Sequence, residues 1–196
     1  MNNNIIERHP LEPFLPQNAR ILMLGSFPPP KVRWSMEFFY PNWINDMWRI
    51  LGYIFYNDKH HFEEQGAKRF NKGAIVEFCT QQGIALYDTA CEVRRLKENA
   101  SDKFLEVVTA TDINALLAAL PDCTAIVTTG QKATDVVVEI FGCKEPLVGE
   151  ASEIDLCGKR MMFWRMPSSS RAYPLPLEKK AEYYRTMLAN EGLLGQ

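Results

Sequence analysis

The sequence lacks long apolar runs, paired cysteines and most standard catalytic motifs. No apolar stretch approaches the roughly 18–20 residues that a membrane span requires. The first residues also lack the basic and apolar regions of a secretory signal. The five cysteines are scattered and include no C-x-x-C pair, which argues against a disulfide framework, a zinc site or an iron–sulfur cluster. We therefore expect reduced thiols, a cytoplasmic location, no membrane association and no metal.

Motifs that bind nucleotide phosphates or build common hydrolytic sites are missing as well. The sequence contains no G-x-G-x-x-G, G-x-x-x-x-G-K-[ST], G-x-S-x-G or H-E-x-x-H, and no organic cofactor is implied. Histidine occurs only as His9, His60 and His61. Adjacent residues on a helix or strand cannot face one site, so we expect these histidines at the surface. Chemistry that needs a histidine general base is therefore disfavoured.

The composition is that of an ordinary globular domain. Hydrophobic residues make up 46% and charged residues 23% of the 196 residues, so a single domain over residues 1–196 is expected. The net charge of −2 argues mildly against a protein that coats nucleic acid. However, residues 159–180 contain six basic side chains and one acidic side chain. This local excess fits either a nucleic-acid contact or solvated helix faces.

Short apolar runs alternate with helical patterns along the chain. Strands are expected over residues 20–25, 83–88, 125–130 and 158–166, and helices over residues 43–54, 63–81, 112–120, 131–141 and 177–190. Such alternation predicts an α/β fold, a three-layer α/β/α sandwich around a short, mainly parallel four-stranded sheet. Ligands of these sheets bind beyond the carboxyl ends of the strands, so the residues that follow each strand are the candidates for a site.

Each candidate position also has a structural interpretation. Phe27 is either a stacking platform in a proline-rich loop or a core residue. Asn42 is expected to cap a helix, whereas Asn45 lies in the first turn and suits an anion or a polarised water. Asp88 is a helix cap or a site residue. The serines and arginine of residues 168–171 could hold a phosphate or form a flexible turn.

Five motifs in order resemble the uracil-DNA glycosylase superfamily, and within it the hypoxanthine-DNA (deoxyinosine) glycosylase branch. They are G-S-F-P at residues 25–28, F-Y through N-D-M-W at residues 39–48, the strands at residues 83–88 and 129–133, and M-P-S-S-S at residues 166–170 with L-E-K-K at residues 177–180. Two departures stand out. The family's G-H-P is absent before Asn45. Arg171 replaces the proline that follows the run of serines at residues 168–170, here called the serine loop.

This resemblance implies a monofunctional DNA glycosylase that flips deaminated bases, hypoxanthine or uracil, out of DNA and hydrolyses the N-glycosidic bond as the first step of base excision repair. It assigns the catalytic water to Asn45. It implies base-binding roles for Ser26, Phe27, Tyr40 and Asp88, and DNA-binding roles for Lys132, Ser168, Ser169, Ser170 and Arg171. No obligate protein partner is implied. A non-catalytic protein that binds damaged DNA or a nucleobase stays an alternative, as does a small-molecule α/β enzyme.

Overall fold

A computed structural model describes residues 5–96, 104–156 and 158–194. The strands are β1 (Ile6–Arg8), β2 (Ile21–Gly25), β3 (Ile84–Asp88), β4 (Ala90–Arg95), β5 (Leu105–Ala110), β6 (Ala125–Thr129), β7 (Ala151–Leu156) and β8 (Lys159–Met166). The helices are the short 3₁₀ helix η1 (Lys31–Arg33) and the α-helices α1 (Met47–Tyr56), α2 (Lys72–Gln82), α3 (Ile113–Ala118), α4 (Gln131–Phe141) and α5 (Leu177–Asn190).

The main sheet has five strands in the order β3-β2-β6-β8-β7. The four expected strands, β2, β3, β6 and β8, pair in parallel. Every residue of β2, β3 and β6 is buried, which explains their continuous apolar sequences. The expectation of four strands was wrong by one, because β7 adds an antiparallel edge that pairs with β8. Its exposed and buried residues are mixed, so its apolar signal is weak.

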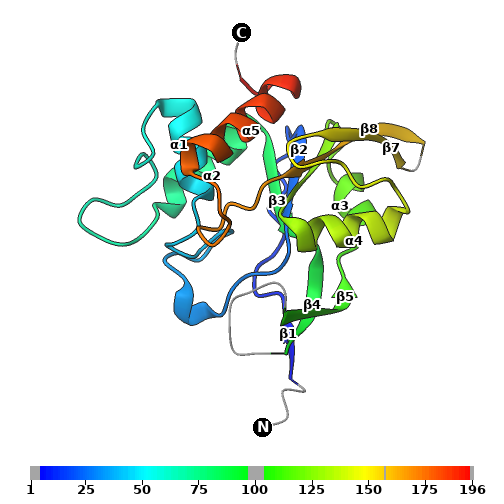
Figure 1. Cartoon of the computed structure of the whole chain (residues 1–196), viewed down its shortest axis with the longest axis horizontal. Coiled ribbons are helices and arrows are strands. Elements are labelled where there is room, and N and C mark those ends of the chain that lie inside the picture. Colours follow the sequence, from blue (N-terminus) through cyan, green and yellow to red (C-terminus); the bar gives the residue numbers. More distant parts are fainter. Residues whose placement is uncertain (1–4, 97–103, 157, 195–196) are drawn as a thin grey trace.

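A second sheet, which the sequence did not predict, joins β1, β4 and β5 in antiparallel order. It begins directly beyond the main sheet, because β3 ends at Asp88 and β4 starts at Ala90 (Figure 1). No helix follows Asp88, so this residue does not cap one. Burial does not alternate regularly along β4 and β5, and these two strands pair with register shifts, so the sequence shows no clear strand pattern there.

Helices cover both faces of the main sheet. Helices α1, α2 and α5 lie on one face and α3 and α4 on the other (Figure 1), as the layered prediction requires. Helices α4 and α5 begin and end where expected. Asp112 caps α3 by accepting a hydrogen bond from the Ala115 N–H at 3.0 Å. The longest of the described helices, α5, has 14 residues, and none of them is long and apolar enough to span a membrane.

Two helices begin later than predicted. Helix α1 starts at Met47 because Asn42 forms a turn rather than a cap: its Oδ1 accepts the Ile44 N–H at 3.2 Å. Helix α2 starts at Lys72, after a folded loop whose Phe70 is 1% exposed. Asn71 provides the cap of α2 and accepts the Ala74 N–H at 3.1 Å. The two asparagines show that side chains of the same type can end a turn or start a helix.

Helix α5 is held to the end of β8 by one buried hydroxyl. Tyr184 is 0% exposed, and its hydroxyl donates to the Pro167 carbonyl at 2.9 Å. The Tyr184→Phe variant leaves that buried carbonyl without this donor, so we expect a loss of about 1–3 kcal/mol in the free energy of unfolding, measured by urea denaturation. The adjacent Tyr183→Phe is the control, because Tyr183 is 38% exposed and should change stability by less than about 0.5 kcal/mol. Equal stabilities of the two variants would contradict this role.

Candidate active site

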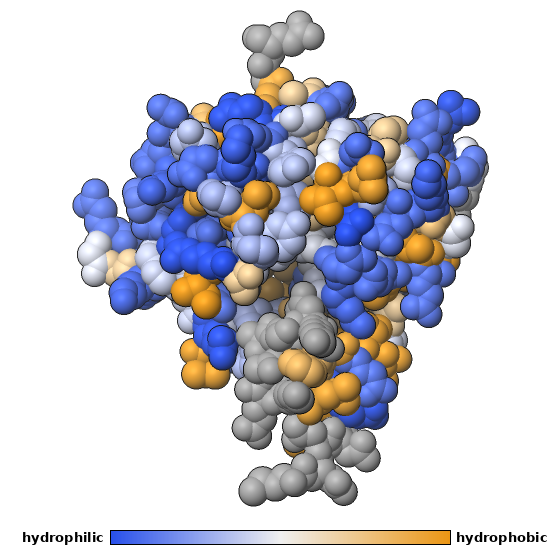
Figure 2. Space-filling model, viewed as in Figure 1, coloured by the Kyte–Doolittle hydropathy of each residue, from blue (hydrophilic) through white to orange (hydrophobic). Residues whose placement is uncertain are grey.

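A cavity of about 560 Å³ lies at the carboxyl ends of the parallel strands. Its walls come mainly from residues 25–29 at the end of β2, residues 39–42, 44 and 45 before α1, Asp88, Thr129, and residues 168–170 and 172–174 after β8. Figure 2 shows the surface hollowed near the middle of the view, above the grey atoms. This volume is within the roughly 300–1,000 Å³ that is usual for ligand sites. The position is the one that the strand-end rule predicts.

Eight of the ten predicted site residues meet in this cavity. They are Ser26, Phe27, Tyr40, Asn45, Asp88, Ser168, Ser169 and Ser170. Arg171 and Lys132 do not line it. Lys132 lies in the first turn of α4, and Arg171 is turned toward Asp46, with 2.8 Å between Arg171 Nε and Asp46 Oδ1. The predicted catalytic and base-binding residues therefore share one cavity with the three serines, and the two cationic residues predicted to contact DNA lie outside it.

Tyr40 occupies an unusual backbone conformation at the cavity wall. Its φ is 49°, in the left-handed region that costs a bulky residue on the order of 1–3 kcal/mol. The hydroxyl lies 3.0 Å from Thr129 Oγ1, and the ring packs edge-on against Trp48 at 6.0 Å between centroids. Burial raises the pKa of Tyr40, so the phenol stays protonated and is able to donate a hydrogen bond.

Asn45 is fixed just before α1 by its own backbone neighbourhood. Its Oδ1 accepts the Met47 N–H at 2.9 Å, which orients the amide plane. Within the part of the chain that the structure describes, no hydrogen bond engages the Asn45 Nδ2 group. Asn45 also forms a bridge with Ser170, and the neighbouring Asp46 N–H donates to the Ser169 carbonyl at 2.9 Å. The amide therefore faces the cavity from a segment that is joined to the serine loop.

A buried charge network holds this segment in place. Asp46 is 6% and Arg49 is 3% exposed. Arg49 Nη1 lies 3.4 Å from Asp46 Oδ1, and Arg49 Nε lies 2.5 Å from Glu63 Oε1. Arg49 Nη1 also donates to the Asn45 carbonyl at 3.2 Å. Since Arg171 binds the same Asp46 oxygen, one carboxylate links the segment before α1 to the loop after β8.

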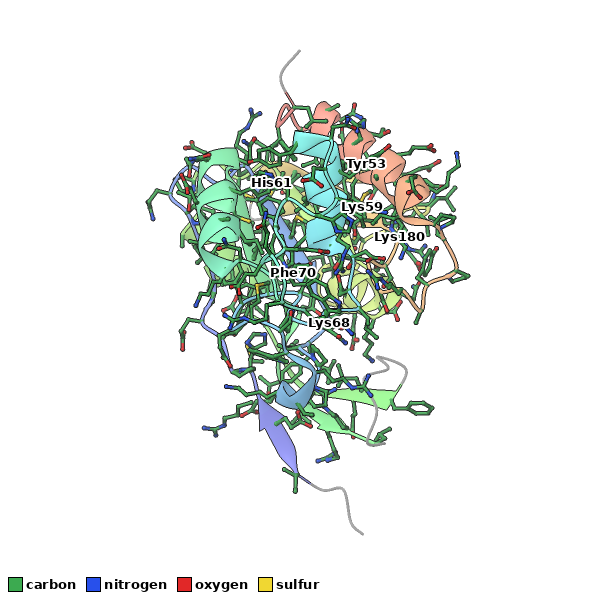
Figure 3. All side chains as sticks on the ribbon, turned by 90° about the vertical axis from the view of Figure 1, so that its left-hand side faces the viewer. Tyr53, Lys59, His61, Lys68, Phe70 and Lys180 are labelled. Carbon is green, nitrogen blue, oxygen red and sulfur yellow. The ribbon has the colours of Figure 1, made fainter. Side chains whose placement is uncertain are left out.

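Lys180 supports the serine loop from behind. This residue of α5 is 1% exposed and lies beside α1 (Figure 3). Its Nζ donates to the Ser170 carbonyl at 2.7 Å. Burial lowers the pKa of Lys180, while the Asp46 carboxylate acts in the opposite direction. Lys180 does not line the cavity, so it holds the loop rather than presenting its amine to a ligand.

The prediction that all three histidines lie at the surface was wrong for His9. His60 and His61 are exposed, but the His9 side chain is only 2% exposed, and its Nε2 lies 2.9 Å from Asp88 Oδ2. The reason is the unpredicted β1, which pairs with β4 and carries the following residues under the cavity. A lone histidine near the amino terminus gives no local signal of this contact.

Phe27 combines the two roles that its sequence left open. It is 8% exposed and packs with the buried residues Ala90, Val93 and Leu105, yet it lines the cavity. Its ring meets His9 edge-on, with 5.3 Å between centroids. The ring is therefore rigidly held and still available on one side.

Comparisons with known proteins identify the fold. No family model and no curated protein matches this chain. A solved solution structure from Methanosarcina acetivorans, of a protein provisionally described as a uracil DNA glycosylase, aligns over 96% of this chain and 99% of its own, with a TM-score of 0.62 and 19% sequence identity. The two chains share the fold.

Among residues 5–96, 104–156 and 158–194, no group of three or more His, Cys, Asp or Glu side chains is placed to hold a metal ion.

The Arg49 network should dominate the stability of the cavity wall. Arg49→Leu leaves Asp46 and Glu63 without their buried partner, so we expect a loss of about 3–5 kcal/mol in the free energy of unfolding. The control is Arg69→Leu, because Arg69 pairs with Glu64 at 3.3 Å and is 64% exposed; it should cost less than about 1 kcal/mol. Denaturant unfolding measures both. A small loss for Arg49→Leu would show that Asp46 is held by other contacts.

Proposed function

We propose that this chain is a monofunctional DNA glycosylase that removes a deaminated base, hypoxanthine or uracil, from DNA. The observation that carries the proposal is the convergence of an asparagine amide, an aromatic ring and a carboxylate in one cavity at the strand ends. The solved structure with the same fold is provisionally described as a uracil DNA glycosylase, which supports the same class of reaction. The sequence motifs favour the hypoxanthine branch.

The cavity suits a base that has left the DNA stack. A base inside a duplex is unreachable, so the enzyme must flip it into a pocket. There, the Phe27 ring offers a stacking surface, and such stacking contributes about 1–3 kcal/mol per base. Asp88 accepts the ring N–H that hypoxanthine and uracil share. Tyr40, kept protonated by burial, becomes a donor for the neighbouring carbonyl of the base when its hydroxyl turns from Thr129 Oγ1 toward the ligand.

Hydrolysis of an N-glycosidic bond can proceed with little base catalysis. The sugar develops oxocarbenium character and the base leaves with negative charge, so the site must position a water and stabilise the departing base. Asn45 positions the water, since Met47 fixes its amide. His9 does not act as a base on this water, because its two ring nitrogens face Asp88 and Leu11.

A hydrolytic outcome rather than a Schiff base follows from the position of the lysines. Among residues 5–96, 104–156 and 158–194, no lysine lines the cavity, and the nearby Lys180 directs its amine to the Ser170 carbonyl. This arrangement supports the proposal that water is the attacking group and that the product is an abasic site.

The serine loop is the proposed contact to the DNA backbone. Ser168 Oγ accepts the Ser170 N–H and Ser170 Oγ accepts the Ala172 N–H, each at 3.2 Å, so both hydroxyl protons stay free to donate. Arg171 is 46% exposed and binds Asp46 only through Nε. Its remaining N–H groups are available to a phosphate oxygen. Lys132, at the start of α4, is a further proposed contact.

The direct test is a base-release assay. Oligonucleotides that carry inosine, uracil or xanthine are incubated with the protein, and alkaline cleavage detects abasic sites. We expect release of hypoxanthine, uracil or both. Binding of these oligonucleotides without release would identify a protein that recognises damaged DNA or a nucleobase. A lack of DNA binding at low salt would reject the proposal and favour a small-molecule enzyme.

Asn45 provides the sharpest test of the hydrolytic step. Asn45→Ala should lower single-turnover base release by about 10²–10³-fold, the usual loss of a positioned electrostatic group, while DNA affinity barely changes. Asn45→Asp keeps the acceptor for the Met47 N–H but removes the NH₂ group. Comparing the melting temperatures of the two variants therefore separates the loss of this turn from the loss of the amide. Asn190→Ala is the control, because its amide donates to the Thr186 carbonyl within α5. Normal turnover by Asn45→Ala would remove Asn45 from the mechanism.

Arg171 tests the contact to DNA. Arg171→Ala should weaken binding and make the dependence of log K on log[salt] shallower by about one phosphate contact. The rate on saturating DNA should fall less than the affinity. Arg160→Ala is the matched control, because Arg160 lies at the opposite end of β8, is 79% exposed and pairs with Glu153 at 3.7 Å. Identical salt slopes for the Arg171 variant and the wild type would leave Arg171 only its structural pairing with Asp46.

A further inference from the structure

We infer that His9 is a positioning residue: it binds one carboxylate oxygen of Asp88 and leaves the other oxygen to accept a hydrogen bond from a base. This arrangement, here called the lock, selects bases with a ring N–H over adenine and cytosine. The inference rests on the proposed function and deepens it, because it concerns which bases the cavity accepts. Its starting point is the contact of 2.9 Å between His9 Nε2 and Asp88 Oδ2 at the edge of the cavity.

His9 is placed to act through Asp88 and not on a ligand. Its side chain is 2% exposed, and its ring centroid lies 4.6 Å from that of Tyr87 and 5.3 Å from that of Phe27. Nδ1 lies 2.9 Å from the Leu11 carbonyl and 3.2 Å from the Leu11 N–H, so this nitrogen is satisfied with or without a proton. Because a carboxylate can only accept, the contact with Asp88 Oδ2 requires the proton on Nε2.

The second Asp88 oxygen is free. Oδ1 lies directly over Gly25, because a Cβ built at Gly25 would sit 2.3 Å from it. In the described parts of the chain no N–H or O–H donates to Oδ1. The side chain keeps 10% of its surface exposed and lines the cavity. One oxygen of the carboxylate is therefore tied to His9 and the other is available to a ligand.

The neighbouring wall supplies the complementary group. The Tyr40 ring also approaches Gly25, with Cε1 3.8 Å from the same Cβ position, so an acceptor and a protonated phenol share one side of the cavity. Hypoxanthine and uracil present a ring N–H next to a carbonyl, which pairs with an acceptor next to a donor. Adenine and cytosine present a lone pair next to an amino group, which places acceptor against acceptor and donor against donor.

This arrangement gives His9 a specific task. A carboxylate that rotates freely could turn an oxygen to the amino group of adenine or cytosine, since acidic side chains do accept such protons. The hydrogen bond to His9 opposes the rotation, and the missing Cβ of Gly25 provides the space that Oδ1 occupies. The preference for deaminated bases therefore depends on a residue that never touches the base.

The test compares His9→Leu, which removes the donor, with His9→Gln, whose amide can donate from nearly the same place. His61→Leu is the control, because His61 is exposed and stacks on Tyr56 at 3.6 Å between centroids. Two quantities are measured for each protein: single-turnover release from an inosine oligonucleotide, and the ratio of affinities for free hypoxanthine and free adenine by calorimetry. Melting temperatures are recorded in parallel.

We expect His9→Leu to lower both the rate and the affinity ratio by about 10–100-fold, the range for losing a charged hydrogen bond or an orienting partner. His9→Gln should recover most of both. Equal losses in the two variants, or an unchanged ratio in His9→Leu, would overturn the inference and leave His9 a packing residue. A wild type that releases no base would refute the proposed function alone, because the affinity ratio still tests the lock; a wild type that binds neither base would overturn the inference too.

Discussion

The buried carboxylate of Asp46 is the constraint on which the candidate site depends. It lies between the guanidinium groups of Arg49 and Arg171, which belong to segments far apart in the sequence. A charge that is 6% exposed is tolerated only when it is paired, so the segment before α1 and the loop after β8 cannot separate without a large cost. The wall that carries Asn45 and the wall that carries the serines are thus held as one unit.

The two walls of the cavity that carry Asn45 and Asp88 are supported by different parts of the fold. In the segment before α1, the Asn45 amide is held by a hydrogen bond of 2.9 Å from the Met47 N–H, as the proposed positioning of a water requires. The opposite wall depends on the small sheet, because β1 leads to His9 and β4 follows directly from Asp88. The second sheet therefore contributes to the cavity, because its strand β1 leads to His9, the residue proposed to orient the Asp88 carboxylate.

The predictable part of the structure was the part with strong local patterns. Strands β2, β3 and β6 are continuous apolar runs, and α4 and α5 carry clear helical patterns, so their positions agreed with the sequence. Strands β1, β4, β5 and β7 lie at edges or in the small sheet, where strands are short or burial does not alternate regularly. The starts of two helices were also misplaced: Asn42 forms a turn rather than the cap of α1, and a folded loop precedes the true start of α2 at Lys72.

The sequence by itself determined the α/β architecture and the strand ends at which eight of the predicted residues meet. Only the tertiary structure decided which polar groups pair: His9 with Asp88, 79 residues apart, and Arg171 with Asp46, 125 residues apart. The physical reason is that hydrophobic periodicity is local and reports which face of an element is buried. A polar pair across such separations leaves no periodic trace, because it depends on how the elements are connected and how deeply the two groups are withdrawn from water.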